Sequence, residues 1–408
     1  MMNICMLSRI MPHHAVGGMQ DHVLTLCRGL ARKNHRVVVI TSGRADGVEV
    51  EIVDGVEIHF LRDTKPGRYS RQFAARSAEK FLELHAARAF DILHSQSVGA
   101  YGIYARGLPH SAGVPLITSL HGTHADVITT SWHTDFALTN PRGMIRFGAI
   151  VALMTFNYGS RDMWFLSGSD ILIATSDADV WKYKRYYGAR ASQIRKVYNG
   201  IDTDLFAPRD AKDLRARLNI APDEKMILAL ARLQKDKGVQ NAIEVLARVR
   251  AELPARLVIV GDGDYRAALE LLARERGVAA FTHFGGAQTL AECARYFNAC
   301  DLFVDPTLRT DGYDLTIAEA MACAKPVIVS DVGANSTLID AATQRDGVLI
   351  PRGDNAALAR EILRVMHDPE RARAMGELGR AKIAARFSIG AMVDGIEQVY
   401  LEMKRLRD

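Results

Sequence analysis

Hydrophobic positions along the chain fall into short apolar runs, rich in β-branched residues, that alternate with longer segments of helical periodicity. In the first half these runs predict strands at 3–7, 36–40, 56–60, 91–94, 115–119 and 171–175. The second half repeats the same alternation and predicts strands at 226–229, 256–260, 281–284, 302–305, 326–329 and 347–350. Strands that alternate with helices form parallel sheets covered on both faces. The pattern therefore predicts an α/β protein with two doubly wound, Rossmann-like domains in tandem.

The segments between these strands predict helices and domain boundaries. The helices are expected at 19–33, 72–89, 238–252, 264–275, 289–298, 315–322 and 355–367. Gly200 and Pro208 interrupt the pattern, so the domains are predicted at 1–203 and 204–386. From about Phe387 a final amphipathic helix, 387–408, carries one apolar stripe and is expected to pack on the first domain. Such sheets bind ligands at the carboxyl ends of their strands, here facing a cleft between the domains.

Composition limits the class of protein but does not indicate which reaction it catalyses. The chain has 408 residues, 48% of them hydrophobic, and a net charge of +5, which excludes disorder and gives no nucleic-acid signature. Its five cysteines are odd in number and form no CxxC pair, which argues against a disulfide framework or a structural zinc site. The apolar run 147–156 is too short to span a membrane. A soluble, cytoplasmic protein is expected.

Two loops could meet an anionic ligand. Gly17 and Gly18 lie between the first strand and the first helix, where a helix N-terminus offers free N–H groups. Arg232 and Lys237 lie five positions apart after the first strand of the second half, and this pair would suit a diphosphate. Each loop also has a plain interpretation, since glycines often serve only the turn and charged loops are usually solvated.

Acids and histidines at strand ends are the remaining candidates. Asp311 and Glu319 lie eight positions apart, on a loop and on the helix that follows it. Glu319 has small apolar neighbours and needs a partner, which could be a ribose diol or a nearby basic side chain. His121 ends a strand of the first half and could contact a substrate, whereas His94, also at a strand end, is interpreted as structural.

Taken together, these segments resemble the retaining glycosyltransferases of family 4, which have the two-domain GT-B fold. The most specific match is 311–328, which is similar to the family's E-x7-E element and continues as EAMACAKPVI at 319–328. Supporting matches are ARL at 231–233 with Lys237-Gly238, VGDG at 260–263, NGID at 199–202 and SDVG at 330–333. The resemblance covers nearly the whole chain, in the same order and with the same spacing.

The resemblance implies a role for each matched residue of the second domain. Arg232 and Lys237 would bind the donor diphosphate and stabilise it as a leaving group. Glu319 would hold the nucleotide ribose, and Asp311 would stand where the family has the Glu that holds the donor sugar. The backbone N–H groups of Tyr313, Asp314 and Leu315 would add contacts to diphosphate and sugar.

In the first domain, the resemblance implies that His121 lies under the reacting sugar and that Gly17 and Gly18 shape the floor near phosphate and acceptor. It also implies a hexosyltransferase-type enzyme that retains anomeric configuration and uses no metal or other cofactor. The donor would be a nucleoside diphosphate sugar. The acceptor would be a glycan, glycolipid or lipid-linked intermediate of bacterial-type envelope polysaccharide synthesis.

Three other functions stay open: a GT-B sugar phosphorylase, a nucleotide-sugar epimerase and a non-catalytic nucleotide-sugar-binding subunit. The chain departs from the family at Asp311, one methylene shorter than the usual Glu, and at Asp314, where a small Gly is usual. The charge of Asp314 should repel a nearby anion unless it is turned to a cation, a donor hydroxyl or a donor amine, so we expect Asp314 to disfavour acidic donor sugars such as uronic acids. The alternative is that it only caps the helix that begins at Leu315.

One segment of the first domain matches nothing in the family pattern. Residues 143–156 are apolar and have Arg142, Arg146 and Arg161 nearby. They are interpreted either as a buried helix or as a surface in peripheral contact with an anionic membrane, at its inner face, that carries the acceptor.

Overall fold

The computed structural model describes residues 1–14, 18–67, 70–134, 136, 141–310 and 314–406. The chain divides into two compact units. Unit 1 consists of Met1–His124, Val151–Gly200 and Ile389–Asp408, and unit 2 consists of Ala125–Ile150 and Ile201–Ser388. The sequence had placed the two boundaries after residues 203 and 386, with residues 125–150 inside the first domain. The structure instead groups that segment with unit 2.

The described residues of unit 1 form an eight-stranded sheet in the order β3-β4-β2-β1-β5-β6-β7-β8, parallel except for the β3–β4 pair. The strands are β1 Asn3–Leu7, β2 Arg36–Ser42, β3 Val50–Val53, β4 Val56–Leu61, β5 Ile92–Gln96, β6 Leu116–Ser119, β7 Ile171–Ala174 and β8 Ile194–Lys196. Cys5 in β1 pairs with Val38 on one side and Leu93 on the other, so β1 is central and buried on both faces. This is the doubly wound sheet that the alternating pattern predicted.

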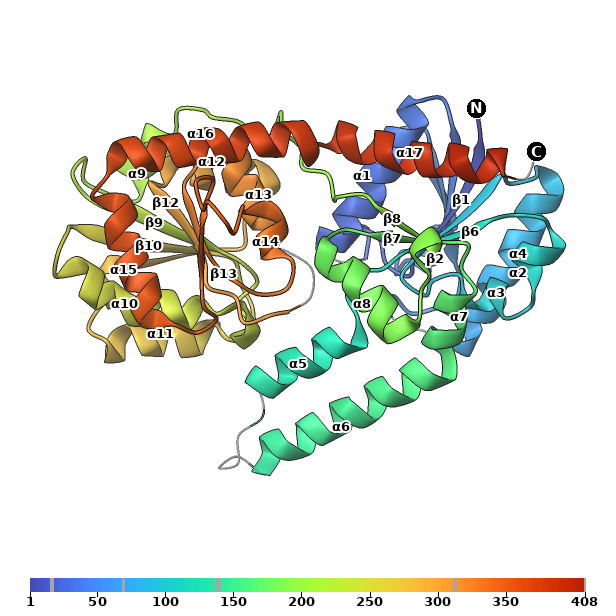
Figure 1. Ribbon diagram of the computed structural model, residues 1–408, viewed down its shortest axis with the longest axis horizontal. Coiled ribbons are helices and arrows are strands. Elements are labelled where there is room, and N and C mark those ends of the chain that lie inside the picture. Colours follow the sequence, from blue (N-terminus) through green and yellow to red (C-terminus); the bar gives the residue numbers. More distant parts are fainter. Residues whose placement is uncertain (15–17, 68–69, 135, 137–140, 311–313, 407–408) are drawn as a thin grey trace. The chain divides into compact units, whose positions relative to one another are not determined.

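Helices cover both faces of that sheet (Figure 1). They are α1 Gly18–Arg32, α2 Arg71–Ala87, α3 Tyr101–Tyr104, α4 Leu108–Ser111, α7 Met163–Ser167, α8 Asp177–Tyr187 and the C-terminal α17 Ile389–Arg405. The predicted apolar stripe of α17 is buried in the core of unit 1 with α1 and β1: Met392, Ile396, Val399, Tyr400 and Met403. The final helix therefore returns to the first unit, as predicted.

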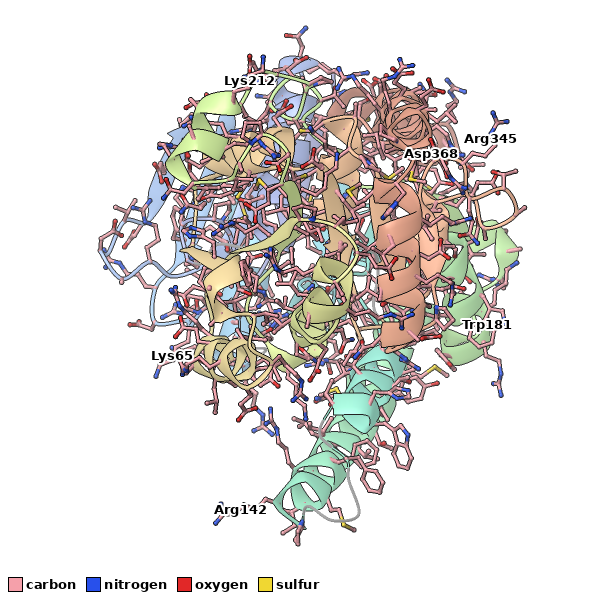
Figure 2. The ribbon with its side chains drawn as sticks, turned by 90° about the vertical axis from the view of Figure 1, so that its left-hand side faces the viewer. Lys65, Arg142, Trp181, Lys212, Arg345 and Asp368 are labelled. Atoms are coloured by element: carbon pink, nitrogen blue, oxygen red, sulfur yellow. The ribbon has the colours of Figure 1, made fainter. Side chains whose placement is uncertain are left out.

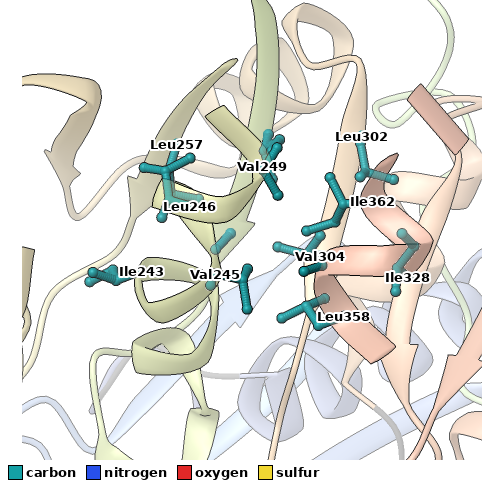
Figure 3. Packing of buried hydrophobic residues seen from close by; sticks show 14 of the residues in the cluster. Ile243, Val245, Leu246, Val249, Leu257, Leu302, Val304, Ile328, Leu358 and Ile362 are labelled. Carbon is teal, nitrogen blue, oxygen red and sulfur yellow. The ribbon is translucent and has the colours of Figure 1, made fainter. Parts of the chain in front are cut away.

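Unit 2 contains a six-stranded parallel sheet, within its described residues, in the order β11-β10-β9-β12-β13-β14. Its strands are β9 Lys225–Leu230, β10 Ala255–Val260, β11 Thr282–Gly286, β12 Leu302–Asp305, β13 Val327–Ser330 and β14 Val348–Ile350. The helices are α9 Lys212–Arg217, α10 Val239–Arg250, α11 Arg266–Glu275, α12 Leu290–Ala299, α13 Leu315–Ala322, α14 Asn335–Leu338, α15 Asn355–Met366 and α16 Pro369–Arg386. Figure 3 shows the apolar layer in which Val249 and Ile362 pack with strand residues such as Val304.

Two further helices, α5 His124–Thr134 and α6 Pro141–Asn157, follow β6. The interpretation of 143–156 as a buried helix is wrong, because Gly143 is the one buried residue among the described side chains of α6. Ile145 is 74% exposed and Phe156 is 69% exposed. No described helix of the chain is long and apolar enough to cross a membrane.

Candidate functional site

The carboxyl end of the unit 1 sheet carries the first group of predicted residues. α1 begins at Gly18, which places backbone N–H groups of a helix N-terminus after β1. Gly17 lies outside the described residues. His121 follows β6 by two positions and is partly buried. Gly18 and His121 therefore both belong to segments that directly follow parallel strands of unit 1, where α/β sheets bind ligands.

His121 is held by a polar network that sequence analysis did not find. Its Nε2 lies 2.7 Å from Oε1 of Gln96, the last residue of β5, and the ring lies edge-on to His22. Because an amide oxygen only accepts, Nε2 of His121 carries the proton. Burial, and then the neighbouring His22 and His94, lower the pKa of His121 to about 3. The imidazole is therefore neutral at physiological pH.

His94 extends this network into the core of unit 1. It is fully buried, with Nδ1 2.5 Å from the hydroxyl of Tyr400 and Nε2 2.8 Å from Oγ of Ser119. Burial, and then the nearby His22, lower the pKa of His94 to about 3. These bonds join β5, β6 and α17. They agree with the structural interpretation of this residue.

In unit 2, the loop after β9 is packed against the loop after β12. The amide of Leu308 donates to the carbonyl of Asp236 at 2.8 Å, and Oγ1 of Thr307 donates to the same carbonyl at 3.3 Å. Gly238 permits this approach, because a Cβ there would lie 1.8 Å from the carbonyl oxygen of Pro306. Its φ of +69° also lies in the left-handed region that favours glycine. The two loops that carry the predicted donor residues are thus hydrogen-bonded to each other.

Lys237 and Asp314 form the central contact of this region. Lys237 is buried, and its Nζ donates to Oδ1 of Asp314, the residue before α13. Asp314 occupies the N-cap position of α13 but makes no side-chain capping hydrogen bond. The Asp314 carboxylate therefore faces a cation. Under this condition the sequence analysis does not expect Asp314 to repel an anionic donor.

Asp305, the last residue of β12, contacts the Lys237–Asp314 pair through Asp314. Sequence analysis did not identify it. It is buried and hydrogen-bonded to Asp314. Burial and the charge of Asp314 raise the pKa of Asp305 well above its usual range. Burial would also raise the pKa of Asp314, but Lys237 and Arg309 outweigh it and hold that pKa below its usual range. Asp305 is therefore the protonated member of the pair, and Asp314 carries the charge.

The other predicted residues of unit 2 differ in their surroundings. The guanidinium of Arg232 is exposed and makes no hydrogen bond or ion pair with any described residue. Leu315 and Glu319 are partly buried and lie on the same side of α13, one turn apart. Asp311 and Tyr313 lie outside the described residues. The start of α13 thus brings together Lys237, Asp314 and Asp305.

Neither a metal-binding cluster nor the surface hollow of unit 2 adds residues to these regions. In the part of the chain that the structure describes, no group of three or more His, Cys, Asp or Glu side chains could hold a metal ion. A surface hollow between β14 and α15 is lined by Arg360, Arg364 and Arg371 and holds none of the predicted site residues. The candidate functional residues therefore lie in two regions, one at the strand ends of unit 1 and one at the strand ends of unit 2.

Comparison with known proteins gives a consistent result over both units. The model "Glycosyltransferase Family 4" matches residues 16–205, and "Glycosyl transferases group 1" matches residues 210–382. D-inositol 3-phosphate glycosyltransferase 2 of Catenulispora acidiphila is 30% identical, over 94% of this chain and 90% of its own. N-acetyl-alpha-D-glucosaminyl L-malate synthase of Bacillus anthracis is 26% identical, over 96% of this chain and 95% of its own.

Solved structures show the same fold. Sucrose-phosphate synthase from Thermosynechococcus elongatus matches with a TM-score of 0.80 and 22% identity, over 100% of both chains. HepE from Anabaena, in complex with UDP-glucose, matches with a TM-score of 0.76 and 20% identity, over 98% of this chain and 100% of its own. With both units matched by models of one enzyme family, this chain is a GT-B glycosyltransferase that belongs to glycosyltransferase family 4.

Proposed function

We propose that this glycosyltransferase moves a sugar from a nucleoside diphosphate sugar to a hydroxyl acceptor with retention of anomeric configuration. The observation that carries the donor assignment is the pair of hydrogen-bonded loops after β9 and β12. They bring the cation Lys237 to the start of α13, and Arg232, whose guanidinium has no partner among the described residues, lies on the first of these loops. The crystal structure of HepE with UDP-glucose supports the same class of donor.

Within this proposal, the positive groups act on the leaving diphosphate. Arg232 can form a bidentate contact, since nothing in the part of the chain that the structure describes pairs with its guanidinium, and Lys237 supplies a point charge once a phosphate oxygen competes with Asp314. The first backbone N–H groups of α13, beginning at Leu315, have no partners within the helix and favour an anion. These groups stabilise charge that grows as the diphosphate leaves, so the proposed reaction needs no resident metal.

The proposed bond changes balance without an enzymic nucleophile. The acceptor oxygen forms a bond to the anomeric carbon on the face from which the diphosphate departs, while the bond from that carbon to the phosphate oxygen breaks. The acceptor proton passes to the departing phosphate. In this proposal neutral His121 serves as a polar contact to the reacting sugar, and its low pKa keeps it from competing with the cations for the diphosphate.

The acceptor is proposed only as a class, a hydroxyl compound such as a glycan, glycolipid or lipid-linked intermediate. The relatives' names mention inositol 3-phosphate and L-malate, which also carry hydroxyl groups. A sugar phosphorylase or an epimerase of the same fold would act without such an acceptor. Product analysis with free phosphate, or with the donor alone, separates those two activities from transfer.

Isothermal titration with UDP and GDP tests the donor assignment directly. We expect one of them to bind the wild type and to bind Arg232→Ala and Lys237→Ala more weakly. Turnover at saturating donor should fall about 10²–10³-fold in each variant, as when one oxyanion donor is removed. Arg373→Ala, an exposed arginine on α16, is the matched control and should behave as wild type. Absence of binding to any nucleoside diphosphate would refute the assignment.

A further inference from the structure

Exposed apolar side chains are concentrated in one short stretch of the chain. Of the eighteen large hydrophobic side chains that are exposed among the described residues, eight fall between Val127 and Trp164. Four of these belong to the part of α5 and α6 that is grouped with unit 2: Val127, Trp132, Met144 and Ile145. A protein surface rarely shows so much apolar area in one place unless something covers it.

The two helices contact each other through aromatic rings. Trp132 stacks on Phe136, with ring centroids 4.2 Å apart and planes 13° from parallel. Phe147 of α6 lies edge-on to both, at 5.6 Å and 5.4 Å. Trp132 remains 48% exposed in this cluster. The aromatic contacts thus hold the two helices together and leave their apolar side chains accessible.

The exposed charged side chains that are described between α5 and the middle of α6 are of one sign. Arg142 and Arg146 are exposed, and Figure 2 shows Arg142 pointing away from the ribbon at the start of α6. Asp126, the one acid among the described residues of 125–150, is buried. α6 has no acidic residue over its whole length. We call Val127, Trp132, Met144 and Ile145, with Arg142 and Arg146, the hairpin surface.

α5 is anchored to the loops after β9 and β12 of unit 2. Nζ of Lys235 donates to the carbonyl of Thr134 at 2.5 Å, at the end of α5. The amide of Thr310 donates to Oγ1 of Thr130 at 3.3 Å, and Oγ1 of Thr310 donates to the carbonyl of Asp126 at 3.3 Å. These polar contacts fix α5 beside the loops that hold Lys237, while the hairpin surface takes no part in them.

We propose that the hairpin surface docks on an anionic lipid membrane. Aromatic and aliphatic side chains with arginines, and with no exposed acid among the described residues of 125–150, are suited to the boundary between headgroups and acyl chains. A second copy of the chain fits less well, because a two-fold interface would bring arginine to arginine. The proposal goes beyond the transfer reaction, since docking requires no donor. It would hold the donor loops close to a lipid-borne acceptor.

Vesicle flotation of the full chain tests the proposal. Wild type should float with vesicles of phosphatidylcholine and phosphatidylglycerol, and at least tenfold less with phosphatidylcholine alone. Ile145→Glu should lower flotation at least tenfold, and Arg142→Glu about fivefold or more, the factor for one basic residue near an anionic surface. The matched controls are Ile52→Glu, 73% exposed on β3, and Arg373→Glu, 73% exposed on α16. Both controls should float as wild type.

Tryptophan fluorescence gives a second readout. In Trp164→Phe/Trp181→Phe, Trp132 is the remaining tryptophan, and its emission should shift to shorter wavelength when anionic vesicles are added. The proposal is overturned if wild type does not float, if Ile145→Glu floats as wild type, or if neutral vesicles bind equally well. Self-association that Ile145→Glu abolishes, without vesicle binding, would assign the surface to a second copy instead. Because no donor is present, failure here leaves the proposed transfer reaction untouched.

Discussion

At the scale of single residues, the Lys237–Asp314 contact determines the charge at the start of α13. The two residues are separated by 77 positions, and the lysine is buried. Asp314 neutralises this lysine where the family usually has a small residue. A phosphate oxygen must therefore compete with a carboxylate that the chain itself supplies, which should weaken the binding of the diphosphate product.

Asp314→Gly tests this competition. Without ligand, we expect the free energy of unfolding of unit 2 to fall by about 2–3 kcal/mol, less than for a fully buried pair because Asp314 keeps some contact with water. A nucleoside diphosphate should bind about tenfold more tightly and should raise the Tm of the variant more than that of wild type. Asp314→Gly also leaves the positive charge of Lys237 without its carboxylate partner, so donors with uronic acids should gain relative to neutral donors, as measured with a donor panel.

Two variants control this experiment. Asp314→Asn keeps the shape and removes the charge, so it should reproduce the tighter binding. Lys237→Ala/Asp314→Gly removes both partners and should abolish the gain. If Asp314→Gly lowers Tm but leaves diphosphate affinity and donor order unchanged, Asp314 has a structural role only.

Sequence analysis identified Lys237 and Asp314 as site residues, but it did not identify all the residues that the site residues contact. Lys237 and Asp314 were recognisable from local motifs, and the need of Asp314 for a cation followed from charge alone. Asp305 and Gln96 were missed, because each is the last residue of a buried strand and has no motif around it. Their importance comes from hydrogen bonds to residues far along the chain, which local patterns do not encode.

At the scale of elements, the close packing of the loops after β9 and β12 depends on Gly238. Both Gly238 and Gly277 have a φ of +69°, but a Cβ at Gly277 would meet no atom within 4 Å. Gly277→Ala should therefore cost only the backbone strain, about 1–2 kcal/mol of unfolding free energy. Gly238→Ala has the same backbone strain and also forces the loops after β9 and β12 apart.

We expect Gly238→Ala to be more destabilising than Gly277→Ala by at least 2 kcal/mol and to weaken nucleoside diphosphate binding, because Lys237 moves with its loop. Urea unfolding and isothermal titration on both variants measure the two effects. Equal losses of stability in the two variants, with unchanged diphosphate affinity, would show that the loop contact does not position the site.

The elements themselves were largely predictable from periodicity. β1, β12 and α13 have the predicted bounds, because each is a continuous apolar run or helix with clear ends. β3 and β8 were missed: β3 alternates exposed and partly buried residues at the sheet edge, and β8 spans three residues, two of them basic. The exposure of α6 was only one of two interpretations of the sequence, since an apolar helix is normally buried.

At the scale of the whole molecule, the buried histidines make the stability of unit 1 depend on pH. In the unfolded chain a histidine binds its proton near pH 6.5. In unit 1 burial lowers the pKa of His94 and His121 to about 3, and that of His22 to about 4. Between these values the unfolded chain holds more protons. The free energy of unfolding should therefore fall as the pH falls below 6.5.

The expected slope is about 1.4 kcal/mol per pH unit for each such histidine. Urea unfolding at pH 7, 6 and 5 measures it, followed in Trp132→Phe so that both remaining tryptophans, Trp164 and Trp181, report on unit 1. His94→Gln should reduce the slope, whereas His110→Gln, at an exposed position of α4, should leave it unchanged. An undiminished slope in His94→Gln would contradict this account.

The placement of α17 has a consequence for synthesis on the ribosome. Unit 1 begins with β1, yet Met392, Ile396 and Tyr400 belong to the same buried core as Met2 and Ile4. Residues 201–388 of unit 2 are translated in between. The nascent chain can therefore assemble the sheet of unit 2 while the first unit still lacks a helix of its core. Until that helix emerges, the apolar surface of α1 and β1 that it later covers stays open to water, to chaperones and to neighbouring nascent chains.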